Sequence, residues 1–429
     1  MRRAFPAALG AALLVVSLGL ARADAKPVVI LLSFDGVRHD YLERGSLPAF
    51  ERIAREGARA EGLVPIFPST TFPNHVALAT GTHADRHGIV GNKFLDARLG
   101  EFDYGNDARF LDAEPLWAAA ERQGVAAATY FWVGSETDWR GVGARYRKAP
   151  FDGKLGEAAK VAQILAWQDL PEPERPGLVM AWWHGADHAG HDHGPDAKQT
   201  TAALRAQDKE LAKLLAGLDQ REAWGETTLL VVSDHGMTAY EKTVDVRAVL
   251  AEAGVRARVI HAVASAQIYL KQPAQAARAV EVLRALPGVE AWAREDVPER
   301  LRYRHPRVGD VVALAAPPLA LRPANDRGAR FGGLARLFGG ALGAHGYDPG
   351  RYEAMHGIFV ALGRGVPAGA RLPRVRAIDV APTVALLLGI APPASSEGAP
   401  IPALGEGAPI SGISPPSSPP RPPAPPAAR

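Results

Sequence analysis

The chain has 429 residues, in which 49 lysines and arginines nearly balance 46 aspartates and glutamates. This balance, without any lysine- or arginine-rich run, argues against a protein dedicated to binding nucleic acid. Cysteine is absent, so disulfide bonds, thiolate metal ligands and a lipid-anchored cysteine are all excluded. The length accommodates one large α/β domain with a substantial insertion or a second domain.

The first 25 residues have the pattern of a signal peptide. Arg2 and Arg3 supply positive charge, Ala7 to Leu20 is apolar, and the small residues that follow predict cleavage after Ala23 or Ala25. The apolar run is too short to span a bilayer comfortably. We therefore expect an exported protein, periplasmic or secreted, without a permanent membrane span; an uncleaved anchor is the alternative.

Five apolar runs predict strands that are buried on both faces. The runs Val28 to Leu32, Leu178 to Trp182 and Leu229 to Val232 are continuously apolar, as are "VAAATYFWVG" and "GIFVALG". Segments with helical periodicity lie between them: Pro48 to Glu56, Pro115 to Arg122, Glu157 to Gln168 and Ala202 to Leu218. This alternation predicts an α/β fold with a doubly wound, mostly parallel central sheet and helices on both faces.

The remaining segments predict an insertion and a tail. Residues 238–351 contain the strand-like "SAQIYLKQ" and "DVVALAA" and a helical stretch from Pro273 to Leu286, and we interpret them as an inserted cap domain. Residues 26–237 and 352–393 then form the catalytic core. Residues 394–429 are rich in proline and serine, which predicts a disordered tail.

Acidic residues and histidines follow several of the predicted strands. Because ligands bind beyond the carboxyl ends of the strands in such sheets, we expect these side chains to meet. Each alone is weak support, since an aspartate at a strand end is often a turn former or helix cap. Together they suggest two metal sites of three protein ligands each, with positions open for substrate. The candidates are Asp35, Asp187, His191, Asp234, His235 and His356.

The stretch "FPSTTFPN" offers a nucleophile. It opens a predicted helix from Pro73 to Thr80, so Thr71 lies at or near its N-cap. The simple interpretation is that Thr71 caps this helix. The same position also suits a bound phosphoryl group, and a nearby metal would activate the hydroxyl. Spacing alone leaves Ser69 and Thr70 as competitors.

Six stretches give the chain a resemblance to the nucleotide pyrophosphatase/phosphodiesterase (NPP) family of the alkaline phosphatase superfamily. They occur in the order of that family and cover roughly Val28 to Ile390: "LLSFDGVRHDYL", "FPSTTFPNHVALATGTHADRHGIVGN", "EPLWAAAERQGVAAATYFWVGSE", "DHAGHDHGP", "SDHGM" and "MHGIFVALG". The resemblance implies an alkaline phosphatase-like fold with two Zn²⁺ ions; Mn²⁺ or Fe is also compatible with such ligands.

The resemblance also implies a role for each matching residue. Thr71, directly before "FPN", is the nucleophile that forms a covalent phospho-threonine, and Asn92 holds a non-bridging phosphate oxygen. Asp35, Asp234 and His235, with the Thr71 oxygen, match one zinc site; Asp187, His191 and His356 match the other.

One departure concerns the substrate pocket. The family commonly has acidic residues ahead of the site aspartate, whereas this chain has "WWHGAD". Trp182 falls where the family often places a ring that stacks on a nucleobase, and we expect Phe151 to be its partner across the pocket. The alternative is that both rings belong to the core. Because of the departure at "WWHGAD", the nucleotide preference stays open, since related enzymes act on phospholipid-type diesters.

The expected function is therefore two-metal hydrolysis of phosphodiester or nucleotide pyrophosphate bonds in a small-molecule substrate. One alternative is a phosphomonoesterase of the same superfamily, with Arg38 or Arg86 supplying the extra positive charge. The other is a non-catalytic, metal-dependent binding protein, which would have lost a ligand or the nucleophile.

Overall fold

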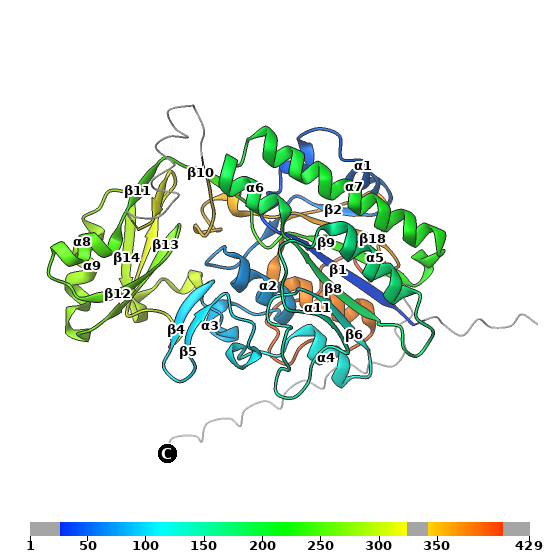
Figure 1. The fold of residues 1–429 in the computed structure, drawn as a ribbon, viewed down its shortest axis with the longest axis horizontal. Coiled ribbons are helices and arrows are strands. Elements are labelled where there is room, and N and C mark those ends of the chain that lie inside the picture. Colours follow the sequence, from blue (N-terminus) through cyan, green and yellow to red (C-terminus); the bar gives the residue numbers. More distant parts are fainter. Residues whose placement is uncertain (1–25, 324–341, 406–429) are drawn as a thin grey trace, which may run out of the picture.

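The computed structural model describes residues 26–323 and 342–405, and the predicted signal peptide lies outside them. The central sheet has eight strands in the order β19-β2-β18-β9-β1-β8-β6-β7 (Figure 1). Five of its seven pairings are parallel, and β18 is antiparallel to both its neighbours. The strands are β1 (Val28–Phe34), β2 (Ala58–Ala60), β6 (Ala127–Tyr130), β7 (Tyr146–Lys148), β8 (Leu178–Trp183), β9 (Thr227–Val232), β18 (Phe359–Gly363) and β19 (Ala370–Leu372).

Helices cover both faces of this sheet, which is why its central strands are apolar throughout. Every residue of β1, β8 and β9 is buried. One layer contains α1, α5 and α7, and the other contains α2, α4 and α11 (Figure 1). The predicted doubly wound α/β fold is thus confirmed. The helices are α1 (Pro48–Glu56), α2 (Thr71–Thr80), α4 (Leu116–Arg122), α5 (Glu157–Gln168), α7 (Lys198–Gln220) and α11 (Val380–Leu388).

The insertion forms a separate sheet with two helices beside the core. Its antiparallel sheet has the order β12-β13-β15-β14, and its helices are α8 and α9. Strand β10 leaves the core and pairs with the returning strand β17, so both ends of the insertion lie together (Figure 1). Its elements are β10 (Thr238–Tyr240), β11 (Lys242–Val244), α8 (Val246–Glu252), β12 (Ala257–Ala262), β13 (Ser265–Leu270), α9 (Ala276–Arg284), β14 (Val289–Ala293), β15 (Val311–Ala315), β16 (Leu319–Leu321) and β17 (Leu342–Ala344).

The residues of the insertion, here called the cap, belong to two apolar clusters. It has its own apolar cluster, which includes Ile268 and Leu283. Other cap residues, Tyr303 and Val308 among them, are buried in the same cluster as the core strands. The inner side of the cap is therefore continuous with the core, which fixes the cap relative to the central sheet.

The predicted disorder of the tail is wrong for residues 394–405. The amide of Ala394 donates to Glu114 at 2.8 Å, and Arg302 pairs with Glu397 at 2.6 Å. Ile401 and Leu404 are buried. These anchors overcome the compositional bias toward disorder, while residues 406–429 lie outside the described part. Across 26–323 and 342–405, no helix is both long and apolar enough to cross a membrane.

Candidate active site

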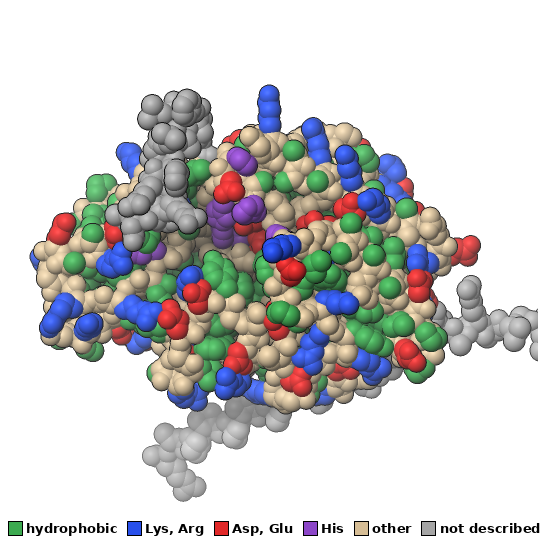
Figure 2. Space-filling view, viewed as in Figure 1, with side chains coloured by type: hydrophobic (Ala, Val, Ile, Leu, Met, Phe, Trp, Pro, Cys, Tyr) green, Lys and Arg blue, Asp and Glu red, His purple; other side chains and the backbone are tan. Residues whose placement is uncertain are grey.

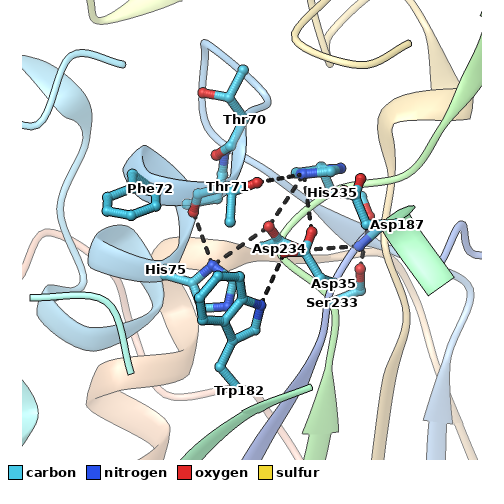
Figure 3. Close-up of polar contacts among 12 residues, drawn as sticks. Asp35, Thr70, Thr71, Phe72, His75, Trp182, Asp187, Ser233, Asp234 and His235 are labelled. Atoms are coloured by element: carbon cyan, nitrogen blue, oxygen red, sulfur yellow. Dashed lines mark hydrogen bonds and ion pairs between the residues drawn. The ribbon is translucent and has the colours of Figure 1, made fainter. Parts of the chain in front are cut away.

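Of the three adjacent hydroxyls, that of Thr71 faces the candidate metal ligands. Helix α2 begins at Thr71, and its hydroxyl oxygen lies 3.3 Å from His235 Nε2 (Figure 3). Ser69 is occupied elsewhere, since its hydroxyl donates to the Tyr347 carbonyl at 2.7 Å. Thr70 points away from the group, and its buried hydroxyl contacts no hydrogen-bond partner among the described residues (Figure 3). The tertiary structure thus distinguishes three candidates that spacing could not.

Asp35, Asp234 and His235 meet at the carboxyl ends of two neighbouring strands. Asp35 follows β1, and Asp234 lies two residues past the end of β9. His235 Nε2 is 3.4 Å from Asp35 Oδ1 and 3.2 Å from Asp234 Oδ2 (Figure 3). Because β1 and β9 are parallel neighbours, their ends bring these side chains together.

A second group lies beside the first. Asp187 and His191 occupy one face of α6 (Gly185–His193), with Asp187 Oδ1 3.4 Å from His191 Nε2. His345 completes this group, since its Nε2 is 3.1 Å from His191 Nε2 and 3.8 Å from Asp187 Oδ1. Asp187 also lies within ligand distance of Asp35 and His235, so its carboxylate stands between the two groups. Histidine side chains accordingly gather in a hollow where the cap meets the core (Figure 2).

The structure corrects the assignment of His356. Its Nε2 lies 2.9 Å from the Pro349 carbonyl, so this nitrogen carries the proton that it donates there. Among the described residues, the ligand atoms that come together with those of Asp187 and His191 belong to His345. His345 takes the expected position because it directly follows β17, whose partner β10 begins shortly after His235. In the sequence, His345 lies in a Gly-rich segment within residues 238–351, the range interpreted as the cap domain, so nothing local marked it as a ligand.

The hydrogen bonds of the three histidines leave their Nε2 atoms available to bind a cation. Each ring has its Nδ1 beside a carbonyl oxygen, which only accepts, so each Nδ1 carries the proton and each Nε2 a lone pair. His191 and His345 therefore present two lone pairs to each other at 3.1 Å. A metal ion removes this conflict, and such backbone partners are typical of metal-ligating histidines. The pairs are His235 with Gly236 at 2.8 Å, His345 with Ser69 at 3.0 Å and His191 with Gly343 at 3.1 Å.

The carboxylates give the same indication. Asp35, Asp187 and Asp234 each have one buried oxygen without a hydrogen-bond partner among the described residues. Burial, reinforced by the charge of Asp234, raises the pKa of Asp35 well above its ordinary value. Burial and the charge of Asp187 likewise raise the pKa of Asp234. Divalent cations would compensate this concentration of negative charge, so the residues present fit a metal centre.

Asn92 contacts the first turn of α2, next to Thr71. Its Oδ1 accepts a hydrogen bond from the backbone N–H of Phe72 at 2.9 Å. With Oδ1 engaged at the first turn of α2, the amide NH₂ group is the donor available to a ligand.

Trp182 and Phe151 do not face each other across an open pocket; their rings stack directly on each other. Their ring centroids are 4.8 Å apart with an interplanar angle of 26°, which leaves no space for a third ring between them. Trp182 is only 9% exposed, whereas Phe151 is 39% exposed. The indole nitrogen of Trp182 also donates to Asp35 Oδ2 at 2.9 Å (Figure 3). Trp182 therefore contacts a candidate metal ligand directly.

Buried Lys160 forms a hydrogen bond with the backbone of Trp182. Its ammonium group donates to the Trp182 carbonyl at 2.8 Å, and burial lowers the pKa of Lys160 to about 8. The backbone at Trp182 is thereby fixed, and with it the direction in which the indole points.

Trp182→Phe is expected to weaken metal retention about 10-fold, because the phenyl ring cannot hydrogen-bond the Asp35 carboxylate. Competition with a chelator would measure this change independently of turnover. Trp183→Phe is the matched control, since Trp183 is the next residue of β8, fully buried, and packs against Phe34 at 4.6 Å. Equal losses in the two variants would mean that the indole–carboxylate contact has no special role.

The fold and this arrangement of side chains define an alkaline phosphatase-like protein with Asp and His groups placed for a metal site at the ends of its strands. The chain belongs to the type I phosphodiesterase/nucleotide pyrophosphatase family, whose model matches residues 29–348. The resemblance of the sequence motifs to this family is thereby confirmed.

Several known proteins are similar to this chain. A pyrophosphatase/phosphodiesterase of Schizosaccharomyces pombe is 36% identical over 49% of this chain and 44% of its own length. Venom phosphodiesterase of Naja atra is 29% identical over 86% of this chain and 45% of its own length. Bis(5'-adenosyl)-triphosphatase of Xenopus laevis is 27% identical over 86% of this chain and 79% of its own length. The chain thus spans about half the length of the first two relatives.

The structure of murine ectonucleotide pyrophosphatase/phosphodiesterase 5 is also similar. It has a TM-score of 0.77 and 26% identity, and the match covers 86% of this chain and 96% of the murine one. That structure is of an inactive form with a threonine replaced by alanine, in complex with AMP.

Proposed function

We propose that the protein hydrolyses phosphodiester or nucleotide pyrophosphate bonds through a covalent phospho-threonine on Thr71. The observation that carries this proposal is the position of the Thr71 hydroxyl, at the N-terminus of α2 and 3.3 Å from His235 Nε2. The inactive threonine-to-alanine form of the murine relative supports it.

In the first step, the Thr71 oxygen loses its proton and forms a bond to phosphorus, while the bond to the leaving oxygen breaks and that oxygen takes up a proton as it departs. In the second, water attacks the phosphoryl group and Thr71 is released with its hydroxyl restored. The positive end of the α2 dipole stabilises negative charge on the phosphoryl oxygens, and the Asn92 amide donates to a non-bridging one.

Two divalent cations complete this site in the proposal. Asp35, Asp234 and His235 would hold one, and His191 and His345 the other, with Asp187 near both. Zinc is the ion that this set of ligands favours, with Mn²⁺ or Fe as alternatives. Bound cations would lower the pKa of the Thr71 hydroxyl and offset the carboxylate charge.

The substrate is proposed to be a small molecule such as a nucleotide. The names of the relatives support this, since one acts on bis(5'-adenosyl)-triphosphate and another binds AMP. The closed stack of Phe151 on Trp182 leaves the outer face of Phe151 as the surface on which a base could stack.

A diester should be preferred over a monoester because Arg38, one of the two arginines considered for the extra positive charge, is committed elsewhere. Its guanidinium bonds Asp40, Asp196 and the Met237 carbonyl, so it cannot neutralise the extra charge of a terminal phosphate. We expect kcat/KM for bis-p-nitrophenyl phosphate to exceed that for p-nitrophenyl phosphate by about 100-fold, which corresponds to roughly 2.7 kcal/mol. The opposite preference would favour a phosphomonoesterase, and turnover of neither would favour a binding protein.

We also propose export, on the basis of the first 25 residues and of relatives named as venom and ecto-enzymes. The intact mass of the product from the periplasm or medium should correspond to cleavage after Ala23 or Ala25. A product that retains residues 1–23 would contradict this.

A further inference from the structure

Side chains of the cap donate hydrogen bonds to the backbone of the loop that carries Asn92. This loop lies between α3 (Ala84–His87) and β4 (Lys93–Asp96), which forms a hairpin with β5 (Gly100–Asp103). The cap residues that contact it are far away in the sequence, in β13 and in the segment before β15. In Figure 1 this hairpin lies at the boundary between cap and core.

Arg307 is the central contact. Its side chain is 4% exposed, and its guanidinium donates hydrogen bonds on both sides of the Asn92 loop. Gly88 itself lies so close to Arg307 that a side chain there would clash, since a Cβ atom on Gly88 would lie 2.3 Å from Arg307 Nη1. The partners of Arg307 are Gly88 O at 2.9 Å, Phe110 O at 2.6 Å, Asp96 Oδ2 at 2.6 Å and Asp112 Oδ1 at 3.3 Å.

Two further cap residues reach the middle of the same loop. The buried hydroxyl of Tyr303 donates to the Val90 carbonyl. The amide of Gln267 donates to the same carbonyl at 3.4 Å and to Lys93 O at 3.5 Å. Tyr303 also packs edge-on against Phe67, with 5.0 Å between ring centroids, on the segment that leads into Thr71. Tyr303 therefore contacts both loops that supply the proposed catalytic groups.

We propose that Arg307, Tyr303 and Gln267 are positioning residues through which the cap sets the Asn92 amide relative to Thr71. Their hydrogen bonds fall at the start of the loop, in its middle and directly after it, at Gly88, Val90 and Lys93. The loop has few conformations left, so the Asn92 amide is held where its Oδ1 meets the Phe72 N–H. Fixed placement of a charge-stabilising donor is what makes it effective in a transition state. This inference rests on the proposed function of Asn92.

The test is a double-mutant cycle between Tyr303→Phe and Asn92→Ala, followed through kcat and KM for a diester. Asn92→Ala should lower kcat/KM by about 100-fold, as loss of one oxyanion donor does. Tyr303→Phe removes a single hydrogen bond to the loop. It should lower kcat about 5-fold in the parent and less than about 2-fold in the Asn92→Ala background. The second effect is smaller because alanine at position 92 has no amide for the loop to position.

Tyr347→Phe is the matched control. Tyr347 is also a buried cap tyrosine whose hydroxyl donates to a carbonyl, that of Leu319 at 2.8 Å, but this bond lies away from the Asn92 loop. Its effect should be the same in both backgrounds. Arg307→Lys keeps the charge but cannot reproduce four hydrogen bonds, so it should behave as Tyr303→Phe does, with a larger loss.

The outcomes separate the two levels of the proposal. If Tyr303→Phe lowers kcat by an equal factor in both backgrounds, the cap supports only stability and the positioning role is overturned. If Asn92→Ala itself leaves kcat/KM unchanged, the proposed function of Asn92 fails, and the positioning role fails with it. Thermal melting of each variant would show whether it remains folded.

Discussion

Thr71→Ala is expected to abolish diester hydrolysis, with kcat reduced by at least about 10⁴-fold, while the fold and metal content are preserved. The threonine oxygen is the nucleophile of the first step in the proposal, and the methyl group of alanine cannot form the covalent intermediate. The substitution removes the Thr71 oxygen from this site but keeps its three other ligands, since Asp35, Asp234 and His235 contact one another independently of Thr71. Steady-state kinetics and metal analysis of the same preparation would measure both properties.

Thr70→Ala is the matched control for this variant. The Thr70 hydroxyl faces away from the site and makes no side-chain cap to α2, so its removal should change kcat by less than about 3-fold. Parent-like turnover by Thr71→Ala would refute the covalent mechanism. A comparable loss in Thr70→Ala would instead show that the loop conformation, rather than the Thr71 oxygen, limits the reaction.

His345→Ala is expected to lose about one equivalent of metal and at least about 100-fold in kcat, whereas His356→Ala should retain both metals. The reason is that His345 Nε2 faces His191 and Asp187, while His356 Nε2 faces the Pro349 carbonyl. Losing one of three protein ligands leaves an incomplete site. Metal content per chain after dialysis, measured by mass spectrometry, would compare the two variants.

These histidine variants also test the correction made from the structure. Both residues are buried, 6% and 5% exposed, so generic destabilisation by the loss of an imidazole should be similar. Loss of metal in His356→Ala with retention in His345→Ala would reverse the assignment. Loss in neither would remove the second metal site from the proposal.

Much of the fold and part of the site could be predicted because their signals are local. The continuous apolar runs became β1, β8 and β9, since strands buried on both faces need apolar residues at every position. Asp35 and Asp234 could be placed near each other because each follows such a strand. Asp187 and His191 could also be placed near each other from the sequence, because their spacing of four residues corresponds to one helical turn.

The sequence by itself determined the α/β architecture, the family and the aspartates and histidines tied to strand ends. Only the tertiary structure decided that His345 rather than His356 joins Asp187 and His191, because that choice depends on β17 pairing with β10 across the whole cap. It also decided that Trp182 contacts Asp35 and stacks on Phe151, and that residues 394–405 pack on the core. Such contacts join positions far apart in the chain, and composition and periodicity describe only neighbours along it.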